Sequence, residues 1–394
     1  MSARDEGLAG GSPSRLALDG DAPVRAGIQR RERCEATRER IASWLLGGRA
    51  QPSRDSGGYP SATGGVAGSV GADGAVEYLY PEITGYFLQW LAASVTRRNG
   101  AQFAQHAQHA QEWLSQWVAV RPAPPTRVHV CVSRDDWRNH AIFCFDHAMV
   151  LRGLSSAAQR GLLTPEPRLV AGVCAQLESL IAADGLLDAC RAHGDPSMLP
   201  QRWSTRRGGF LAKATAGILN AQGTLDVPSR LVAAARASHA DSLRRAVSEP
   251  HDETHPFLYA FEGLLARFDE DDARAALPPM LAQLDNVLGD FRAHGRMRES
   301  RADRSRGRLD IIAQAARVLL ILRSRKPSLE FEPDLLAELL DTLAGAVRSD
   351  GSLPFALDQP GNEANTWTGM FAEQAFAYAE AMETFPAAIE RFLV

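Results

Sequence analysis

The most constraining feature of the sequence is a helical segment that is apolar on almost every side. Residues 81–97 begin such a segment with Pro81-Glu-Ile-Thr-Gly-Tyr-Phe-Leu-Gln-Trp-Leu91. Proline is tolerated in the first turn of a helix, and a carboxylate there is favoured by the helix dipole. Only one stripe is polar, and it consists of Glu82, Tyr86 and Gln89 at i, i+4 and i+7. Because a helix of this kind is buried nearly all round, its polar stripe must face a wet space inside the protein.

Segments of this buried type alternate along the chain with amphipathic helices. We predict the buried type near 81–97, 140–158, 208–220, 256–268, 308–323 and 366–383, and the amphipathic type near 29–46, 101–120, 166–183, 228–247, 272–292 and 333–348. Connections from a buried to an amphipathic helix are short, and the reverse connections are long. The buried helices therefore run in one direction, and their N-termini share one face with the long loops.

Composition limits the classes of function. The apolar fraction of 45% is enough for a large core, and a net charge of −4 argues against a nucleic-acid or membrane binder. No run of apolar residues is long enough to span a membrane, and the N-terminus does not resemble a secretory signal. Five cysteines without a C-x-x-C pair indicate reduced thiols. We expect a cytoplasmic protein.

The chain is expected to form one domain. Residues 1–28 are rich in Gly, Ser, Asp and Arg without periodicity and are predicted to be a disordered arm. Residues 29–394 carry all of the predicted helices. Cysteines and histidines do not have the spacing of zinc ligands, and no phosphate-binding glycine loop follows a strand, so we expect neither a metal nor a cofactor.

The helix pattern resembles that of the (α/α)6 toroid, or six-hairpin, superfamily over about residues 29–384. The resemblance rests on the alternating helices, on the turns Asp184-Gly185 and Asp350-Gly351, and on the helix starts Gly208-Gly-Phe210 and His255-Pro-Phe257. It implies an all-α ring of inner and outer helices, with an open helical solenoid as the alternative. The superfamily includes unsaturated-glucuronyl hydrolases, polysaccharide lyases, sugar epimerases, terpenoid cyclases and lanthionine cyclases.

In such a ring the ligand site is a funnel at the N-terminal ends of the inner helices, where unpaired N–H groups favour anions. The long loops add arginines, which suit carboxylates and phosphates. These are Arg134, Arg138, Arg202, Arg206, Arg207, Arg296, Arg298, Arg301, Arg304, Arg306 and Arg308. The expected ligand is an acidic saccharide or another anionic small molecule. Alternatively, these arginines pair with loop acids such as Glu299 and Asp303, or are solvated.

The polar residues of the inner helices supply candidates for acid–base chemistry. A carboxylate in an apolar funnel has a raised pKa and can act as an acid, whereas histidine with tyrosine suits proton abstraction. The candidate catalytic residues are Tyr80, Glu82, His147, His255 and Asp310. The candidate substrate-binding residues are Tyr86, Trp203, Arg207, Lys213, Tyr259, Arg304, Arg306, Arg308 and Trp367.

These patterns and the resemblance favour a metal-independent, carbohydrate-active enzyme for an acidic saccharide. Hydrolase, lyase and epimerase remain open. The alternatives are a cyclase or tailoring enzyme of a biosynthetic pathway, and a non-catalytic saccharide-binding or scaffold protein.

The arginine-rich loop before Arg308 provides a first test. Replacing Arg304 and Arg306 by alanine should weaken binding of an acidic sugar more than replacing Arg244 and Arg245, which belong to an outer helix. The measurement is the ligand-induced rise in melting temperature at low and high salt. Equal losses in the two double variants would mean that the attraction is only general charge.

Overall fold

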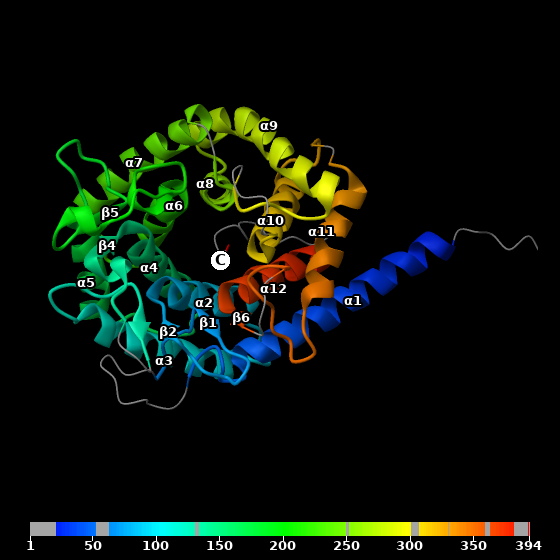
Figure 1. Cartoon of the computed structure of the whole chain (residues 1–394), viewed down its shortest axis with the longest axis horizontal. Helices are drawn as coiled ribbons and strands as arrows, with labels where there is room; N and C mark the ends of the chain where they lie inside the picture. Colours follow the sequence, from blue (N-terminus) through cyan, green and yellow to red (C-terminus); the bar gives the residue numbers. More distant parts are fainter. Residues whose placement is uncertain are drawn as a thin grey trace, which may run out of the picture.

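Inner and outer helices alternate around a ring in the computed structural model (Figure 1). The structure describes residues 21–52, 63–130, 134–249, 252–300, 307–329, 331–358, 363–381 and 393, with side chains from residue 32 onward except at 333. The inner helices are α2 (Pro81–Ser94), α4 (Cys144–Gln159), α6 (Leu211–Ala221), α8 (Thr254–Ala266), α10 (Leu309–Arg325) and α12 (Thr366–Glu380). The outer helices are α1 (Asp21–Leu46), α3 (Gly100–Val118), α5 (Pro167–Glu178), α7 (Ser229–Ser248), α9 (Asp271–His294) and α11 (Pro333–Ala346). The predicted all-α toroid is confirmed.

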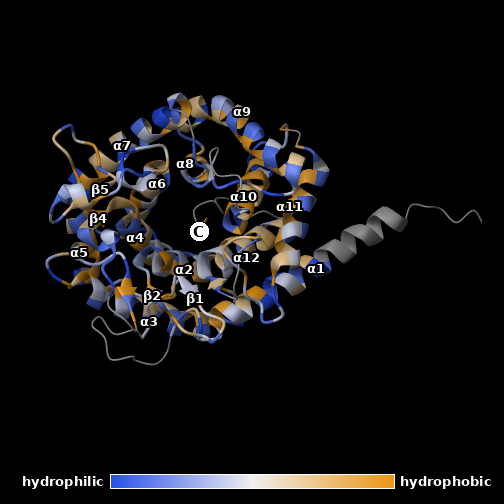
Figure 2. Cartoon of the chain, viewed as in Figure 1, coloured by the Kyte–Doolittle hydropathy of each residue, from blue (hydrophilic) through white to orange (hydrophobic). Residues whose placement is uncertain are grey.

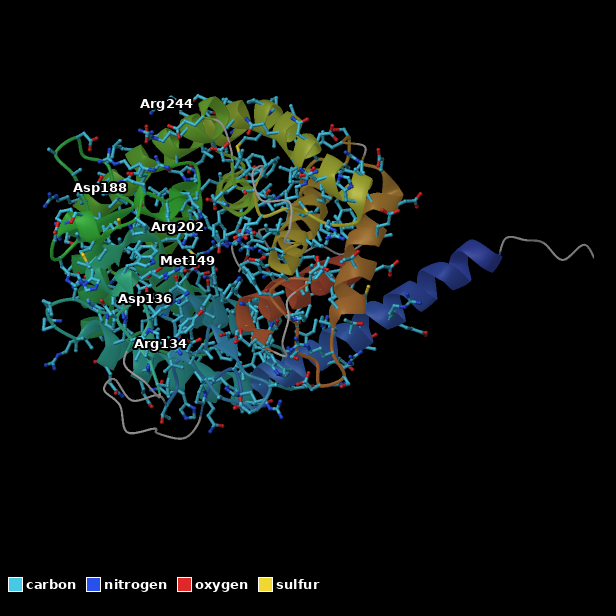
Figure 3. The ribbon with its side chains drawn as sticks, in the orientation of Figure 1. Arg134, Asp136, Met149, Asp188, Arg202 and Arg244 are labelled. Atoms are coloured by element: carbon cyan, nitrogen blue, oxygen red, sulfur yellow. The ribbon has the colours of Figure 1, made fainter. Side chains whose placement is uncertain are left out.

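Burial separates the two kinds of helix as the apolar pattern predicts. In α2 every residue from Pro81 to Ala92 is buried, including Glu82 and Gln89. The outer helices mix hydrophilic and hydrophobic residues along their length, and Arg244 of α7 lies at the outer edge of the ring (Figures 2 and 3). No helix within the described ranges is both long enough and apolar enough to cross a membrane.

The two ends of the described chain close the ring. Each inner helix packs against the next, and α12 packs against α2. The outer helix behind α12 is α1, which comes from the other end of the chain. Arg38 of α1 forms ion pairs with Glu380 and, at 3.5 Å, with Glu373, both of which belong to α12. The last hairpin of the toroid is therefore assembled from residues that are far apart in sequence.

Two predicted boundaries differ from the structure. Helix α1 begins at Asp21, so residues 21–28 belong to a helix and not to an arm; residues 1–20 lie outside the described part of the chain. The second inner helix begins at Cys144 and not near His140. A 3-10 turn (Trp137–His140) and the strand β4 (Ala141–Phe143) precede it, because β4 pairs with β5 (Cys190–Ala192). His140 and His147 therefore do not share one helical face.

The long connections lie on one face and are tied together by short antiparallel strand pairs. Besides β4 and β5, β1 (Ser69–Val70) pairs with β6 (Ala364–Asn365), and β2 (Tyr78–Leu79) pairs with β3 (Val128–His129). The predicted turns at Asp184 and Asp350 are also present. In each turn the aspartate Oδ1 accepts a hydrogen bond from a backbone N–H two residues ahead, at 3.1 and 3.0 Å.

Helices α2 and α4 are in direct backbone contact. A Cβ atom added at Gly85 would lie 2.5 Å from the carbonyl oxygen of Met149, and Gly153 of α4 lies directly against Gly85. Only hydrogen atoms on these two α-carbons allow the backbones to approach so closely. This contact holds the starts of α2 and α4 together.

Replacing Gly85 by alanine should therefore destabilise the protein by about 1–3 kcal/mol, because the added methyl group must push α2 and α4 apart. The matched control is Gly289→Ala in the outer helix α9, where an added Cβ meets nothing within 4 Å. That change should stabilise the protein by about 0.5–1 kcal/mol, since alanine is the better helix former. Denaturant unfolding measures both. Equal effects would contradict the close contact.

Candidate functional site

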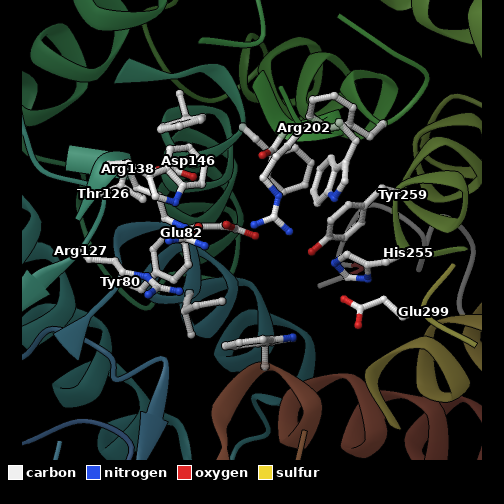
Figure 4. A pocket seen from close by; sticks show the side chains of 18 of the residues that line it. Tyr80, Glu82, Thr126, Arg127, Arg138, Asp146, Arg202, His255, Tyr259 and Glu299 are labelled. Carbon is white, nitrogen blue, oxygen red and sulfur yellow. Dashed lines mark hydrogen bonds between the residues drawn. The ribbon is translucent and has the colours of Figure 1, made fainter. Parts of the chain in front are cut away.

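A cavity of about 190 Å³ opens where the N-terminal ends of the inner helices converge (Figure 4). Every inner helix contributes at or next to its first turn. The contributors are Glu82 of α2, Asp146 of α4, Phe210 beside α6, His255 of α8, Arg308 beside α10 and Trp367 of α12. The shared direction of the inner helices, which the loop lengths predict, thus gathers their first turns around one space.

One wall of the cavity carries two carboxyl groups. Glu82 is the second residue of α2 and Asp146 is the third residue of α4, so the α2–α4 contact brings them to the same wall (Figure 4). The hydroxyl of Thr126 donates a hydrogen bond to Oδ2 of Asp146 at 2.9 Å. Both carboxyl groups are buried, at 9% and 4% exposure.

Burial changes the acidity of this pair. Loss of water raises the pKa of Glu82 to about 7, although the Tyr80 hydroxyl, the Lys213 ammonium and the hydroxyls of Tyr86 and Tyr259 oppose the rise. Burial, followed by the charge of Glu82, raises the pKa of Asp146 well above its usual range. At neutral pH the pair therefore holds at least one proton, in position to be donated to a bound molecule.

The opposite wall carries His255 and Tyr259, whose rings lie 4.2 Å apart. Nδ1 of His255 donates to Oε1 of Gln314 at 2.6 Å, and it also lies 3.6 Å from Oδ2 of Asp310. Burial and then the charge of Arg308 lower the pKa of His255 to about 3. The imidazole is therefore neutral, and Nε2 is its unprotonated nitrogen.

Arg308 and Asp310 support this wall from behind. Arg308 binds Asp310 with Nη2 and Nε at 2.6 and 3.0 Å, and Nη1 contacts Glu299 at 3.0 Å. Trp367 donates Nε1–H to Oδ2 of Asp310 at 3.1 Å. Burial would raise the pKa of Asp310, but the charges of Arg308 and His255 and the hydrogen bonds from Arg308 and Trp367 together outweigh it and lower the pKa below its usual value. Asp310 is therefore ionised.

Most of the arginines near the site are paired. Arg127 and Arg138, which line the cavity, both bind Asp136, at 3.2 and 3.1 Å. Outside the cavity, Arg296 pairs with Asp358 and Arg298 with Asp290. These contacts favour the alternative in which loop arginines neutralise acids. Within the described ranges, Arg202 lines the cavity without an ion pair.

The structure brings together about half of the predicted site residues. The cavity is lined by Tyr80, Glu82, Trp203, His255, Tyr259, Arg308 and Trp367. Asp310 lies behind Arg308, and Tyr86 and Lys213 lie deeper in the ring. Arg304 and Arg306 are outside the described residues.

Two predicted residues lie away from the cavity. His147 packs on Trp117, with 5.0 Å between the ring centroids, and its Nδ1 donates to the carbonyl of Phe143 at 3.0 Å. Burial lowers the pKa of His147 to about 4. Arg207 pairs with Asp184 at 2.5 Å and with Asp188 at 2.8 Å. Neither residue lines the cavity.

Sequence reasoning left several lining residues off its candidate list. The most important is Asp146, which occupies the first turn of α4 as Glu82 occupies that of α2. Placing the helix start near His140 put Asp146 in the second turn and hid this equivalence. The signal that could have identified Asp146 is a carboxylate in the first turn of an inner helix. Sequence analysis named Arg138 and Arg202 only as loop arginines and Glu299 only as a loop acid, and other lining residues such as Thr126, Arg127 and Trp137 were not named.

No protein-family model matches the chain, and no curated protein matches its sequence. Solved structures do match its fold. A cellobiose 2-epimerase from Spirochaeta thermophila DSM 6192 superposes with a TM-score of 0.67 and 11% identity over 92% of this chain and 98% of its own. A D-mannose isomerase superposes with a TM-score of 0.66 and 14% identity, over 89% of this chain and 97% of its own. An unsaturated glucuronyl hydrolase specific for heparin superposes with a TM-score of 0.57 and 13% identity, over 90% of this chain and 98% of its own.

These likenesses define the class of protein. The chain has the (α/α)6 toroid fold, which it shares with sugar isomerases and epimerases, glycoside hydrolases and type II terpene cyclases. At such low identities the comparison establishes the fold alone, so the choice among activities rests on the residues of the cavity.

The raised pKa of Glu82 predicts a pH-dependent cost to stability. A carboxyl group whose pKa rises from 4.5 to about 7 on folding loses its contribution to stability as the pH rises through that range. The glutamine in Glu82→Gln cannot ionise. The melting temperature of this variant minus that of the wild type should therefore increase between pH 4.5 and 7 and stay at its higher value above pH 7. Glu112→Gln, on the exposed side of α3, is the control and should show no such trend. A constant difference across the range would contradict the burial of an ionisable Glu82.

Proposed function

We propose that this protein is an enzyme that hydrolyses a small acidic saccharide by general acid–base catalysis. The observation that carries the proposal is the buried carboxyl pair Glu82 and Asp146 in the wall of the cavity. The fold supports it, because toroids of this kind include enzymes named for acting on sugars.

The two carboxyl groups would divide the chemistry. Asp146, held neutral by burial, donates its proton to the oxygen of the bond that breaks. Glu82, in its ionised form, accepts a proton from water as the water attacks the sugar carbon. The hydroxyl of Thr126 holds Asp146 in place, and the hydrogen bond from the Tyr80 hydroxyl favours the ionised form of Glu82. The protons balance, because one leaves Asp146 and one arrives at Glu82.

The remaining lining residues suit a sugar that carries a carboxylate. Trp203, Trp367 and Trp137 offer flat apolar faces for a sugar ring. Arg202 offers a guanidinium that no described acid pairs with, and guanidinium binds carboxylate with two parallel hydrogen bonds. The cavity volume of about 190 Å³ fits one or two sugar rings better than a long polymer.

A second candidate function is epimerisation or isomerisation by His255 with Tyr259. The observation in its favour is the neutral imidazole, whose Nδ1–H is held by Gln314 and whose Nε2 can accept a proton. Against it, a pKa of about 3 makes His255 a weak base in the empty cavity. Hydrolysis is therefore our first choice.

The test is a panel of small saccharides with and without a uronic acid, including unsaturated uronides, assayed for release of a new reducing end. Glu82→Gln and Asp146→Asn should each lower kcat/KM by about 10²–10⁴-fold, which is the usual contribution of a general acid or base. Arg202→Ala should raise KM for acidic members of the panel and leave neutral members unaffected. Glu112→Gln is the control for the carboxylate changes and should keep full activity.

The other outcomes identify the alternatives. Exchange of solvent deuterium into an unbroken sugar, lost in His255→Gln but kept in Glu82→Gln, would replace hydrolysis by epimerisation. Binding of an acidic saccharide without turnover would indicate a binding protein. Conversion of a polyprenyl substrate but of no sugar would indicate a cyclase.

A further inference from the structure

One oxygen atom joins three of the side chains that line the cavity. Oδ2 of Asp310 accepts a hydrogen bond from Nη2 of Arg308 at 2.6 Å and another from Nε1 of Trp367 at 3.1 Å. The same oxygen lies 3.6 Å from Nδ1 of His255. These three side chains belong to, or directly precede, the first turns of α10, α12 and α8. Asp310 itself is fully buried and does not line the cavity, so it can act on a ligand only through its neighbours.

Further contacts fix the orientation of this carboxylate. Oδ1 of Asp310 accepts from Nε of Arg308 at 3.0 Å and from the backbone N–H of Ile311 at 2.9 Å. The guanidinium thus binds both carboxylate oxygens, which is a strong, charge-assisted geometry that keeps Asp310 ionised. Because Oδ1 is held from two sides, Oδ2 stays turned toward Trp367 and His255.

Asp310 decides which nitrogen of His255 carries the proton. Nδ1 contacts Oε1 of Gln314 at 2.6 Å, but an amide group can present either an acceptor or a donor. An ionised carboxylate can only accept, so Asp310 favours the tautomer with the proton on Nδ1. Nε2 of His255 has no hydrogen-bond partner among the described residues, and the ring lines the cavity. Nε2 is therefore ready to accept a hydrogen bond from a ligand.

The hydrogen bond to Asp310 also fixes the plane of the Trp367 indole. While Nε1–H is held, an edge-on contact with Phe355, with 5.6 Å between the ring centroids, restrains the rest of the ring. Trp367 is only partly buried and lines the cavity, so part of its apolar surface is open to a ligand. Because Trp367 and His255 contact the same oxygen atom, they lie close enough to meet a single sugar ring.

We propose that Asp310 is a positioning residue for a sugar-binding subsite, in which a sugar ring packs on Trp367 and one of its hydroxyl groups donates to Nε2 of His255. This inference rests on the proposed function, because it names the wall that holds the saccharide while the carboxyl pair acts on it. His255 lies across the cavity from Glu82 and Asp146 (Figure 4). An apolar face and a hydroxyl group are common to neutral and acidic sugars, so this subsite recognises both.

The first test is nitrogen NMR of the full-length protein, which distinguishes protonated from unprotonated imidazole nitrogens. The His255 signals, assigned by their loss in His255→Gln, should show a proton on Nδ1 and none on Nε2. In Asp310→Asn the amide carries no charge and can accept at only one of its two positions, so a measurable share of molecules should carry the proton on Nε2. The indole N–H of Trp367 should also exchange faster with solvent. Asp290→Asn, which removes a carboxylate paired with Arg298 at 3.1 Å, is the control and should change neither signal.

The second test is binding of the saccharide panel, followed through the His255 signals and, where there is turnover, through KM. Asp310→Asn should weaken binding of neutral and acidic members alike by about 3–10-fold, which corresponds to the loss of one hydrogen bond, and should change kcat less than KM. Arg202→Ala, in contrast, should affect the acidic members only. A deoxy saccharide that lacks the hydroxyl bound by His255 should bind the wild type and Asp310→Asn equally.

The outcomes separate the two proposals. A proton on Nε2 of His255 in the wild type would overturn the inference, and this measurement holds even if Asp310→Asn does not fold. Turnover that needs Glu82 and Asp146, with an unchanged tautomer in Asp310→Asn, would overturn the role of Asp310 alone. A saccharide that shifts the Nε2 signal of His255 without being turned over would keep the subsite and overturn the proposed hydrolysis.

Discussion

The rest of the site depends on the backbone contact between α2 and α4. Gly85 and Gly153 allow the two helices to touch without intervening side chains. Their first turns are therefore held side by side, and each of these turns carries one carboxyl group, Glu82 or Asp146. Burial, and after it the charge of Glu82, raises the pKa of Asp146 and so keeps a proton in the cavity at neutral pH. The packing of two glycines thus places both carboxyl groups in the same wall of the cavity.

The buried charges of the ring belong to two groups with different partners. Arg308 and Asp310 form a closed pair that braces the wall around His255 and Trp367. Lys213 and Arg317 form a second group, in which both contact the carboxylate of Glu262. Buried charges are costly unless they are paired, and both groups consist of paired charges. The first group lies at the wall of the cavity, and the second is fully buried deeper in the ring.

The sequence predicted which residues line the cavity where a residue's place within a helix decided its position. Glu82, His255 and Tyr259 lie on the inner side of their helices near the N-terminus, and all three line the cavity. It failed where the helix start was misplaced or where a partner decided the role. Asp146 was missed because α4 begins later than expected, and β4 occupies the intervening residues. Arg207, which was expected to bind substrate, pairs with Asp184 and Asp188 and does not line the cavity.

The sequence by itself determined the alternation of buried and amphipathic helices and the face on which the long loops lie. Both follow from local properties, namely hydrophobic periodicity and the lengths of connections. Only the tertiary structure decided that α1 completes the last hairpin with α12, that Glu82 and Asp146 share a wall, and that Lys213 lies beneath them. These relations join residues distant in the chain, and they depend on which side chains meet when the ring closes, which no local pattern records.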